Sequence, residues 1–242
     1  MQDTLSNTIL GGQIHMLQPK DGYRASIDPI LLAAACHPSH DTKMADFGCG
    51  VGTIGLCLKH FEPNLNLTGY EIQSDLADLA MKNTINSHIR IRNENIECVA
   101  KNAYDHIVMN PPYYEEGANV PSPHGSIATA HTGRLDDWFA AARHGLVKGG
   151  YLSAILPAMR FDDVRKLCRR HQFGQMQLMP VYPKFDLPAK RIIFQVRLNK
   201  TRETVIHAGL TLHSGAGRNY TDTAQAILNG QAKLDHFVKD FK

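Results

Sequence analysis

The feature that most constrains the fold of this chain is the alternation of short β-like apolar runs with longer segments of helical period. A strand predicted over residues 43–47 passes through a glycine-rich turn into a helix predicted over 53–61, and a strand over 65–71 with a helix over 74–86 repeats the unit. Strands and helices that alternate in this way build a mainly parallel sheet covered by helices on its faces. The sequence therefore predicts an α/β, Rossmann-like three-layer sandwich.

The remaining elements continue this alternation. Residues 89–92 and 96–99 are both candidates for a third strand, and residues 122–125 are expected to form a loop. Gly149-Gly150 is expected to end a helix before the fifth strand. Further helices are predicted over 29–36, 135–147, 162–171 and 222–228, and further strands over 106–109, 151–156, 175–181 and 191–198, with a closing segment over 209–219.

The length of 242 residues suits one α/β domain with a large core. We therefore expect a single domain over residues 1–242, in which residues 1–40 form an N-terminal segment packed over the ligand side of the sheet. Monomer and homodimer both remain open.

Composition argues against several classes of protein. Hydrophobic residues make up 43% of the chain and charged residues 20%, as in soluble globular proteins. The apolar runs are too short to span a membrane, and the N-terminus lacks a secretory signal. The five cysteines are unclustered and the thirteen histidines scattered, so neither a disulfide framework nor a metal site is expected. A cytoplasmic protein fits best, and its net charge of +3 is compatible with a nucleic-acid partner.

The glycine-rich turn D-F-G-C-G-V-G occupies residues 46–52, where a strand passes into a helix. Glycines at such a place permit positive φ and let a ligand approach the backbone, while the helix N-terminus offers unpaired N–H groups. The turn therefore predicts a site for a ligand rich in hydrogen-bond acceptors.

Two ligand classes fit this turn. Residues 50–55 match the G-x-G-x-x-G pattern of dinucleotide sites, and Glu71 follows at about the spacing of a ribose-binding acid. Asp46, however, would repel a pyrophosphate bound at the helix N-terminus. A carboxylate there suits the cationic sulfonium and ammonium groups of S-adenosylmethionine, with Glu71 accepting hydrogen bonds from both ribose hydroxyls. We therefore favour S-adenosylmethionine, with a nicotinamide-dependent dehydrogenase or a turn without a ligand as alternatives.

The second motif is N-P-P-Y over residues 110–113, directly after a predicted strand. The prolines hold Asn110 and Pro111 stiffly at the carboxyl end of that strand, which is where open α/β sheets bind ligands. The Asn110 side-chain oxygen and the Pro111 carbonyl can accept both N–H hydrogens of a planar amine and favour a pyramidal nitrogen. Tyr113, with Tyr114, can stack on a base. The pattern indicates methyl transfer to an amine nitrogen, although a Pro-Pro turn that merely ends a strand is the structural alternative.

With both motifs in order, the chain resembles the class I methyltransferases of the bacterial tRNA(Val) adenine-N6 methyltransferase type, and most resembles an alphaproteobacterial branch of that type. The resemblance runs through nearly the whole chain. It includes residues 17–19, 22–24 and 27–32, the glycine-rich turn, residues 110–114, 188–191 and 217–221.

The resemblance implies a seven-stranded, mostly parallel sheet with an antiparallel last strand. It implies methylation of the N6 amine of an adenosine in RNA, most often tRNA, with these residues carrying the site: Asp46, Gly48, Gly50, Gly52 and Glu71 for the cofactor, and Asn110, Pro111, Pro112 and Tyr113 for the target amine. Where similar enzymes have an acid that meets the cofactor adenine, this chain has Asn95.

Several other residues are candidates for the cofactor site, the target pocket or the RNA contact. Asp28 either faces the cofactor ammonium group or caps the helix that starts at Pro29. Tyr23 and Arg24, just before Asp28, are expected to border the target pocket. Lys190 and Arg191 follow a proline-containing loop on the ligand side of the sheet and are expected to touch RNA. The basic stretch over residues 165–171 is first of all a solvated helix face, and otherwise a phosphate-binding patch.

Three rival functions remain at this point. A protein glutamine methyltransferase would use the same N-P-P-Y motif, but only 45 residues precede Asp46, where such enzymes usually carry a helical domain. A DNA adenine methyltransferase would need a base-reading domain, but the roughly 130 residues after Tyr113 are mostly taken up by the remaining strands and helices of the sheet. An RNA-binding module with this fold and no catalysis would be expected to have lost the cofactor and acceptor residues, and both sets are present.

Overall fold

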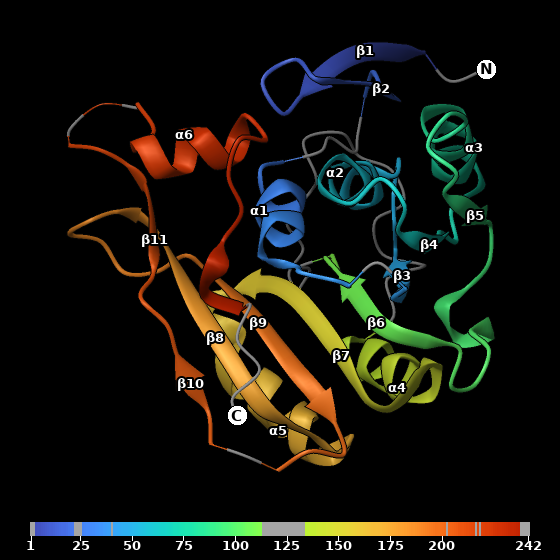
Figure 1. The fold of residues 1–242 in the computed structure, drawn as a ribbon, viewed down its shortest axis with the longest axis vertical. Coiled ribbons are helices and arrows are strands. Elements are labelled where there is room, and N and C mark those ends of the chain that lie inside the picture. Colours follow the sequence, from blue (N-terminus) through green and yellow to red (C-terminus); the bar gives the residue numbers. More distant parts are fainter. Residues whose placement is uncertain are drawn as a thin grey trace.

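The computed structural model describes residues 3–21, 26–39, 41–112, 134–201, 203–215, 217 and 219–237. It shows an α/β protein whose central sheet is covered by helices on both faces (Figure 1). The strands are β1 (Thr4–Ile9), β2 (Ile14–Pro19), β3 (Lys43–Phe47), β4 (Asn66–Tyr70), β5 (Arg90–Arg92), β6 (Tyr104–Met109), β7 (Leu146–Pro157), β8 (Phe173–Lys184), β9 (Arg191–Leu198), β10 (Val205–Ile206) and β11 (Leu210–His213). The helices are α1 (Asp28–Ala35), α2 (Thr53–Phe61), α3 (Ser74–Asn83), α4 (Leu135–Gly145), α5 (Phe161–Arg170) and α6 (Asp222–Leu228), with short 3₁₀ turns η1 (Ile96–Cys98), η2 (Ala158–Arg160) and η3 (Asp235–Phe237).

The sheet confirms the predicted fold class. Its strand order is β10-β8-β9-β7-β6-β3-β4-β5, and β11 also pairs with β8. Strands β5, β4, β3, β6 and β7 are parallel to one another, whereas β9 is antiparallel to both β7 and β8. The sheet thus contains the predicted seven strands with an antiparallel last one, from β5 at one edge to β8. The short strands β10 and β11, which the sequence did not predict as strands, extend the sheet beside β8.

Two apolar layers enclose the sheet. One lies beneath α1, α2 and α6, where Leu31, Leu58 and Ile227 are buried. The other lies beneath α4 and α5, where Phe139 and Phe194 stack with ring centroids 6.4 Å apart. In the part of the chain that the structure describes, no helix is both long and apolar enough to cross a membrane.

The predicted boundary between the helix over 135–147 and the strand after it is wrong. The helix predicted over 135–147 ends at Gly145, and strand β7 starts at Leu146, so that Gly149-Gly150 lies inside a strand and does not end a helix. The helix packs closely at its end, since a Cβ on Gly145 would lie 2.9 Å from a Val99 methyl carbon. Gly149, at φ 81°, then forms an irregularity that shifts the β6–β7 register between Tyr104 and His106.

Two further predictions concern short elements. Of the two candidates for the third strand, residues 90–92 form β5, and residues 96–98 form the 3₁₀ turn η1. The loop expected over residues 122–125 lies outside the described residues.

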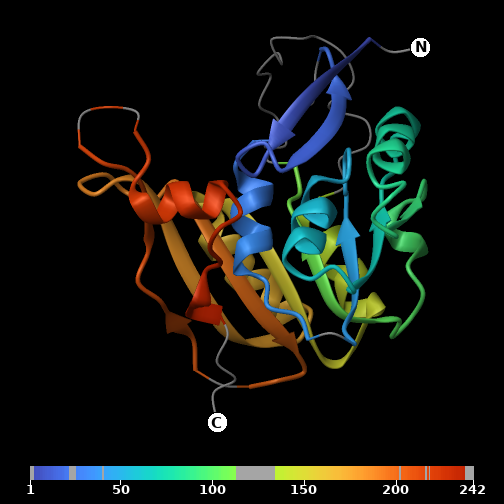
Figure 2. The ribbon, with the colours of Figure 1, turned by 45° about the horizontal axis from the view of Figure 1, so that its top comes forward.

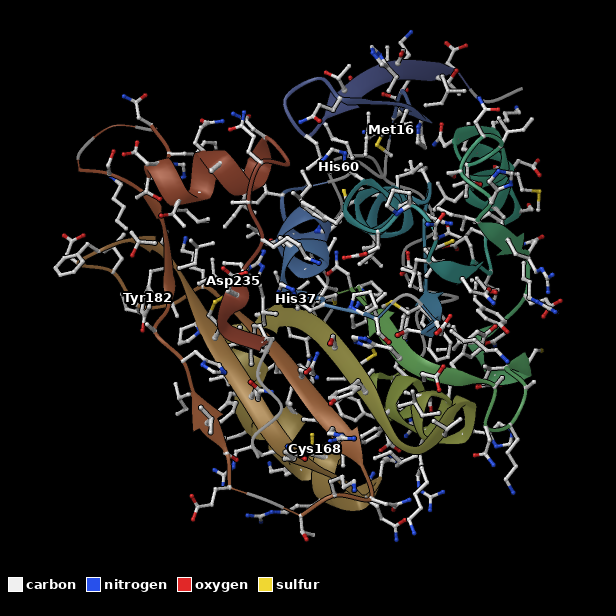
Figure 3. The ribbon with its side chains drawn as sticks, viewed as in Figure 1. Met16, His37, His60, Cys168, Tyr182 and Asp235 are labelled. Atoms are coloured by element: carbon white, nitrogen blue, oxygen red, sulfur yellow. The ribbon has the colours of Figure 1, made fainter. Side chains whose placement is uncertain are left out.

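The N-terminal residues form a hairpin of β1 and β2 that the sequence did not predict. The hairpin lies beside α2 and α3 (Figure 2), and its Met16, 2% exposed, packs with Val51, Leu56, Leu76 and Leu79 (Figure 3). The hairpin therefore shares one small apolar cluster with residues of the glycine-rich turn, α2 and α3.

Replacing this buried methionine should measure how firmly the hairpin is attached. We expect Met16→Ala to lower the free energy of unfolding by about 2–5 kcal/mol in urea titrations, because it removes buried apolar volume and leaves a cavity. Met159→Ala, at a methionine that is 78% exposed, should change it by less than about 0.5 kcal/mol. Equal effects of the two variants would show that the hairpin unfolds independently of the sheet.

Candidate functional site

Three strands deliver the predicted site residues to one edge of the sheet. In β3, Phe47 pairs with Tyr70 of β4 on one side and with Met109 of β6 on the other. The glycine-rich turn, Glu71 and Asn110 follow these three strand ends directly and therefore lie side by side. The glycine-rich turn and the N-P-P-Y motif, which are separated by 58 residues counted from Gly52 to Asn110, thus lie together at the carboxyl edge of the sheet.

The backbone of the glycine-rich turn has a conformation that side chains disfavour. Gly48, Gly50 and Gly52 have φ of 65°, 56° and 91°, all in the left-handed region. At Gly48 space is also limited, since a Cβ would lie 2.5 Å from Cη2 of Trp138 in α4. The turn thus presents backbone and no side chain at these three positions to whatever lies above it.

The Glu71 carboxylate holds the turn in place. Its Oε2 accepts a hydrogen bond from the Gly50 N–H at 2.9 Å, and its Oε1 accepts one from the Gln73 N–H at 2.9 Å. Burial raises the pKa of Glu71, and these N–H donors oppose the rise. Each carboxylate oxygen can accept a further hydrogen bond, so the predicted contact with two ribose hydroxyls is compatible with this arrangement.

Asp46 is a buried carboxylate without a partner. The residue is 1% exposed, and neither carboxylate oxygen has a hydrogen-bond partner. Burial raises its pKa well above the ordinary value of 3.8 and the Glu71 carboxylate raises it further, whereas the backbone N–H of Gly55 opposes the rise. The Thr53 hydroxyl, in the first turn of α2, is also buried and unpartnered. Since buried polar groups are nearly always hydrogen-bonded, this pair marks a place where a ligand with donors or positive charge would be stabilised.

Asn83, at the C-terminal end of α3, ties the glycine-rich turn to the N-terminal hairpin. Its Oδ1 accepts from the Leu17 N–H at 2.7 Å, and its Nδ2 donates to the carbonyl oxygens of Leu17 and Val51, each at 2.9 Å. Sequence analysis missed this residue, which lies inside the helix predicted over 74–86. Its role depends on the hairpin, which the sequence did not predict.

Asn93 and Asn95 lie in the segment after β5. The Asn95 side chain caps η1, accepting from the Glu97 N–H at 3.1 Å, and so has a local structural role besides the predicted contact with adenine. Asn93, which the sequence analysis did not single out, donates from Nδ2 to the carbonyl of Glu71 at 2.8 Å and to that of Ile72 at 3.2 Å. It fixes the backbone at Glu71, beside an Ile72 side chain that is 42% exposed.

Asp28 and Arg191 form an ion pair that sequence analysis did not foresee. Asp28 is 6% exposed, and its Oδ2 accepts from Arg191 Nε at 2.9 Å. The expectation that Asp28 caps the helix is wrong, because Asp28 is the first helical residue and Ile27 holds the cap position without a side-chain bond. Arg191 also donates to the Lys190 carbonyl at 3.1 Å, and its charge is partly neutralised by Asp28.

The other predicted residues divide into two groups. Asn110 is half-buried, Pro111 is buried and Pro112 is exposed, all directly after β6. Tyr23, Arg24, Tyr113 and Tyr114 lie outside the described residues.

The basic stretch over residues 165–171 is partly neutralised by acids. Arg165 lies 3.8 Å from Asp162, and Arg170 and His171 lie 3.0 and 2.9 Å from Asp136. These pairs favour the solvated-face interpretation over a phosphate-binding patch.

Comparison with known proteins identifies the family. The profile of the methyltransferase small domain matches residues 27–187, about two thirds of the chain. The chain belongs to this family. It is a methyltransferase whose cofactor is S-adenosylmethionine. The buried, unpartnered Asp46 and the glycine positions of the turn, which carry no side chain, fit that cofactor, since a cationic ligand would offset the cost of the buried carboxylate.

Two similar proteins of known name are tRNA1(Val) (adenine(37)-N6)-methyltransferases. The protein of a Flavobacteriaceae bacterium is 26% identical over 76% of this methyltransferase and 80% of its own length. That of Pedobacter heparinus is 25% identical over 93% of this chain and 97% of its own length.

Solved structures share the fold. A protein of Agrobacterium tumefaciens, described as a predicted O-methyltransferase, superposes with a TM-score of 0.72 and 21% identity over 86% of this chain and 98% of its own. The Thermus thermophilus 16S rRNA N2 G1207 methyltransferase, solved with S-adenosylmethionine and guanosine, gives a TM-score of 0.54 and 18% identity over 83% of this chain and 46% of its own.

The buried carboxylate predicts how the stability of the free methyltransferase depends on pH. A carboxyl whose pKa is raised by folding contributes stability below its unfolded pKa, and this contribution is lost as the pH rises through the raised value. We therefore expect Asp46→Asn to make the cofactor-free protein more stable than wild type at neutral pH, with the difference vanishing toward pH about 3–4.

Urea unfolding at several pH values, with and without S-adenosylmethionine, would measure this effect. The cofactor should stabilise wild type much more than Asp46→Asn. Asp78→Asn, at an exposed position of α3, is the matched control and should behave like wild type. If Asp46→Asn has a lower free energy of unfolding than wild type at neutral pH, the Asp46 carboxylate does not destabilise the cofactor-free protein and the prediction is wrong.

Proposed function

We propose that this methyltransferase methylates the exocyclic N6 amine of an adenosine in tRNA. The observation that carries the proposal is the position of Asn110, Pro111 and Pro112 at the end of β6, beside the glycine-rich turn. The bound cofactor supplies a methyl group on a positively charged sulfur. The protein has to hold an amine nitrogen in line with it.

Asn110 and Pro111 supply the two acceptors that an amine needs. The nitrogen lone pair of adenine is delocalised into the ring and is a poor nucleophile. If the Asn110 side-chain oxygen and the Pro111 carbonyl accept its two N–H hydrogens, a pyramidal nitrogen with a directed lone pair is favoured. No strong base has to act before transfer, because the acidic proton appears only on the methylated nitrogen and can pass to water. Tyr113 is proposed to stack on the base, with Tyr114, Tyr23 and Arg24 around it.

On the cofactor side, the proposed ligands are Asp46, the glycine backbone at 48, 50 and 52, and Glu71. Asp46 provides the negative charge for the cationic groups of the cofactor, and Glu71 has acceptor capacity left for the ribose. Asn95 is proposed near the adenine, and Asp28 near the ammonium group. The N-terminal segment is proposed to cover this side, which the bonds of Asn83 to Leu17 and Val51 support.

The choice of tRNA rests on the relatives named tRNA1(Val) (adenine(37)-N6)-methyltransferase, which align with most of this chain. A protein glutamine side chain would present a similar planar amide to Asn110, so the experiments below include it. For a catalytically inactive RNA-binding module, an intact buried carboxylate with no structural partner would be costly to keep. A cytoplasmic location goes with the tRNA proposal, and the five cysteines, all unpaired, are compatible with it.

Removing the Asn110 acceptor should separate catalysis from cofactor binding. We expect Asn110→Ala to lower kcat by about 100-fold or more, because the target nitrogen loses one of its two positioning acceptors. The Kd for S-adenosylmethionine, measured by calorimetry, should change by less than about 3-fold. A large loss of cofactor affinity would instead assign Asn110 to the cofactor site.

The acceptor itself can be found with labelled cofactor. Incubation with separated tRNA, rRNA and protein fractions, followed by nucleoside mass analysis, should give N6-methyladenosine in the tRNA fraction. Binding of tRNA should weaken steeply with salt, as counterions are released from phosphates. Label in the protein fraction as methylglutamine would replace the proposal by the amide substrate.

A further inference from the structure

The most exposed large hydrophobic side chain of the described residues lies on the ligand edge of the sheet. Phe185 is 93% exposed and begins the β8–β9 turn, residues Phe185–Lys190, which projects from the body of the protein in Figures 1 and 2. A single exposed apolar residue needs no explanation. Leu187 in the same turn is 43% exposed, however, and Met159 in η2 is 78% exposed. Three exposed apolar side chains on two adjacent segments indicate a contact surface.

The β8–β9 turn is held in a defined position. The Leu187 N–H donates to the Lys184 carbonyl at 3.2 Å, and the Lys190 N–H donates to the Val181 carbonyl at 3.0 Å. The Ala158 N–H of η2 donates to the Lys190 carbonyl at 3.1 Å, so both segments form one rim. Phe185 is therefore exposed on a turn that backbone hydrogen bonds hold in place.

The base of the turn is supported from the side. Tyr182 of β8, labelled in Figure 3, pairs with Thr211 of β11 and packs so closely on Gly209 that a Cβ there would lie 2.2 Å from the tyrosine ring. Pairing of β11 with β8 extends to Lys184, the residue just before Phe185. An aromatic side chain presented on such a support loses little conformational freedom when it binds.

The turn lies on the same edge as the proposed target pocket. Arg191, directly after the turn, pairs with Pro157 at the end of β7. In the next strand pair, Ala154 of β7 lies opposite Met109 of β6, the residue before Asn110. A polymer whose target base reaches Asn110 would extend along this edge toward the turn.

Charge favours nucleic acid as the occupant. The turn and its flank contain Lys184 and Lys190 against one acid, Asp186, and Arg191 is paired with Asp28. An exposed aromatic ring flanked by lysines is the arrangement that binds unpaired bases, in which the ring stacks and the cations meet phosphates.

We propose that Phe185 stacks on an unpaired base of the RNA substrate other than the base that is methylated, and that Lys190 contacts a phosphate beside the stacked base. The inference rests on the proposed RNA substrate and adds a second recognition point to it. In this proposal Lys190 contacts the phosphate, and Arg191 remains in the ion pair with Asp28.

The test is the affinity of the full-length protein for a fluorescein-labelled RNA stem-loop with adenosines in its loop, measured by anisotropy. Phe185→Ala and Phe185→Leu should both weaken RNA binding by roughly 5- to 150-fold relative to wild type. Phe185→Trp should keep the wild-type affinity, because stacking needs a flat ring and not merely apolar surface. Ile206→Ala, at a residue of β10 that is 64% exposed, should leave the affinity unchanged.

Salt titration separates stacking from charge. Phe185→Ala should keep the wild-type slope of log affinity against log salt, whereas Lys190→Gln should reduce the slope by about 0.7, the contribution of one phosphate contact on single-stranded RNA. The affinity for S-adenosylmethionine should be the same in all variants.

The possible failures are distinguishable. Equal RNA affinity of Phe185→Ala and wild type overturns the stacking inference and leaves the proposed function intact. Full RNA affinity of Phe185→Leu overturns the stacking inference, because apolar surface without a ring would then be sufficient. A change in the sedimentation coefficient of the free protein on replacing Phe185 assigns the surface to contact with a second copy of this chain. Absence of methyl transfer to any tRNA by the wild-type protein contradicts the proposed function itself.

Discussion

The burial of the Asp46 carboxylate is the constraint on which the rest of the site depends. A charge without partners in a protein interior is costly, so the surrounding structure has to compensate for it elsewhere. The neighbouring Glu71 adds to the cost by repulsion, yet its hydrogen bonds to the Gly50 and Gln73 N–H groups hold the glycine backbone in its left-handed conformation. A cationic cofactor bound as proposed would offset this cost, so that cofactor binding and the stability of the free protein would oppose each other at this position.

The support for this strained turn comes from distant parts of the chain. Trp138 of α4 packs against Gly48 from one side, and Asn83 of α3 joins Val51 to the hairpin strand β2 from the other. The turn cannot move without disturbing either an aromatic contact or a set of hydrogen bonds. Such preorganisation is what a site needs when its ligand must be held in line with a second reactant.

Sequence patterns predicted the sheet well because parallel strands buried on both faces are marked by continuous apolar runs. Strand β3 and helices α2 and α6 begin and end at the predicted residues, and the two motifs meet at the predicted edge. Where prediction failed, the cause was tertiary. Gly149-Gly150 resembles a helix stop, and only pairing with β6 turns it into an irregularity within β7. The hairpin of β1 and β2, the Asp28–Arg191 pair and the roles of Asn83 and Asn93 depend on contacts between distant residues, which local periodicity does not record.

The antiparallel strand β9 has a consequence for how such a protein diversifies. A parallel strand needs a long crossover to return to the same edge, whereas β8 and β9 are joined by the short turn Phe185–Lys190. Residues can be exchanged or inserted there without altering the register of β3 and β4, which carry the proposed cofactor residues. If the turn contacts the acceptor as proposed, that contact can change in evolution while the methyl-donor site stays the same.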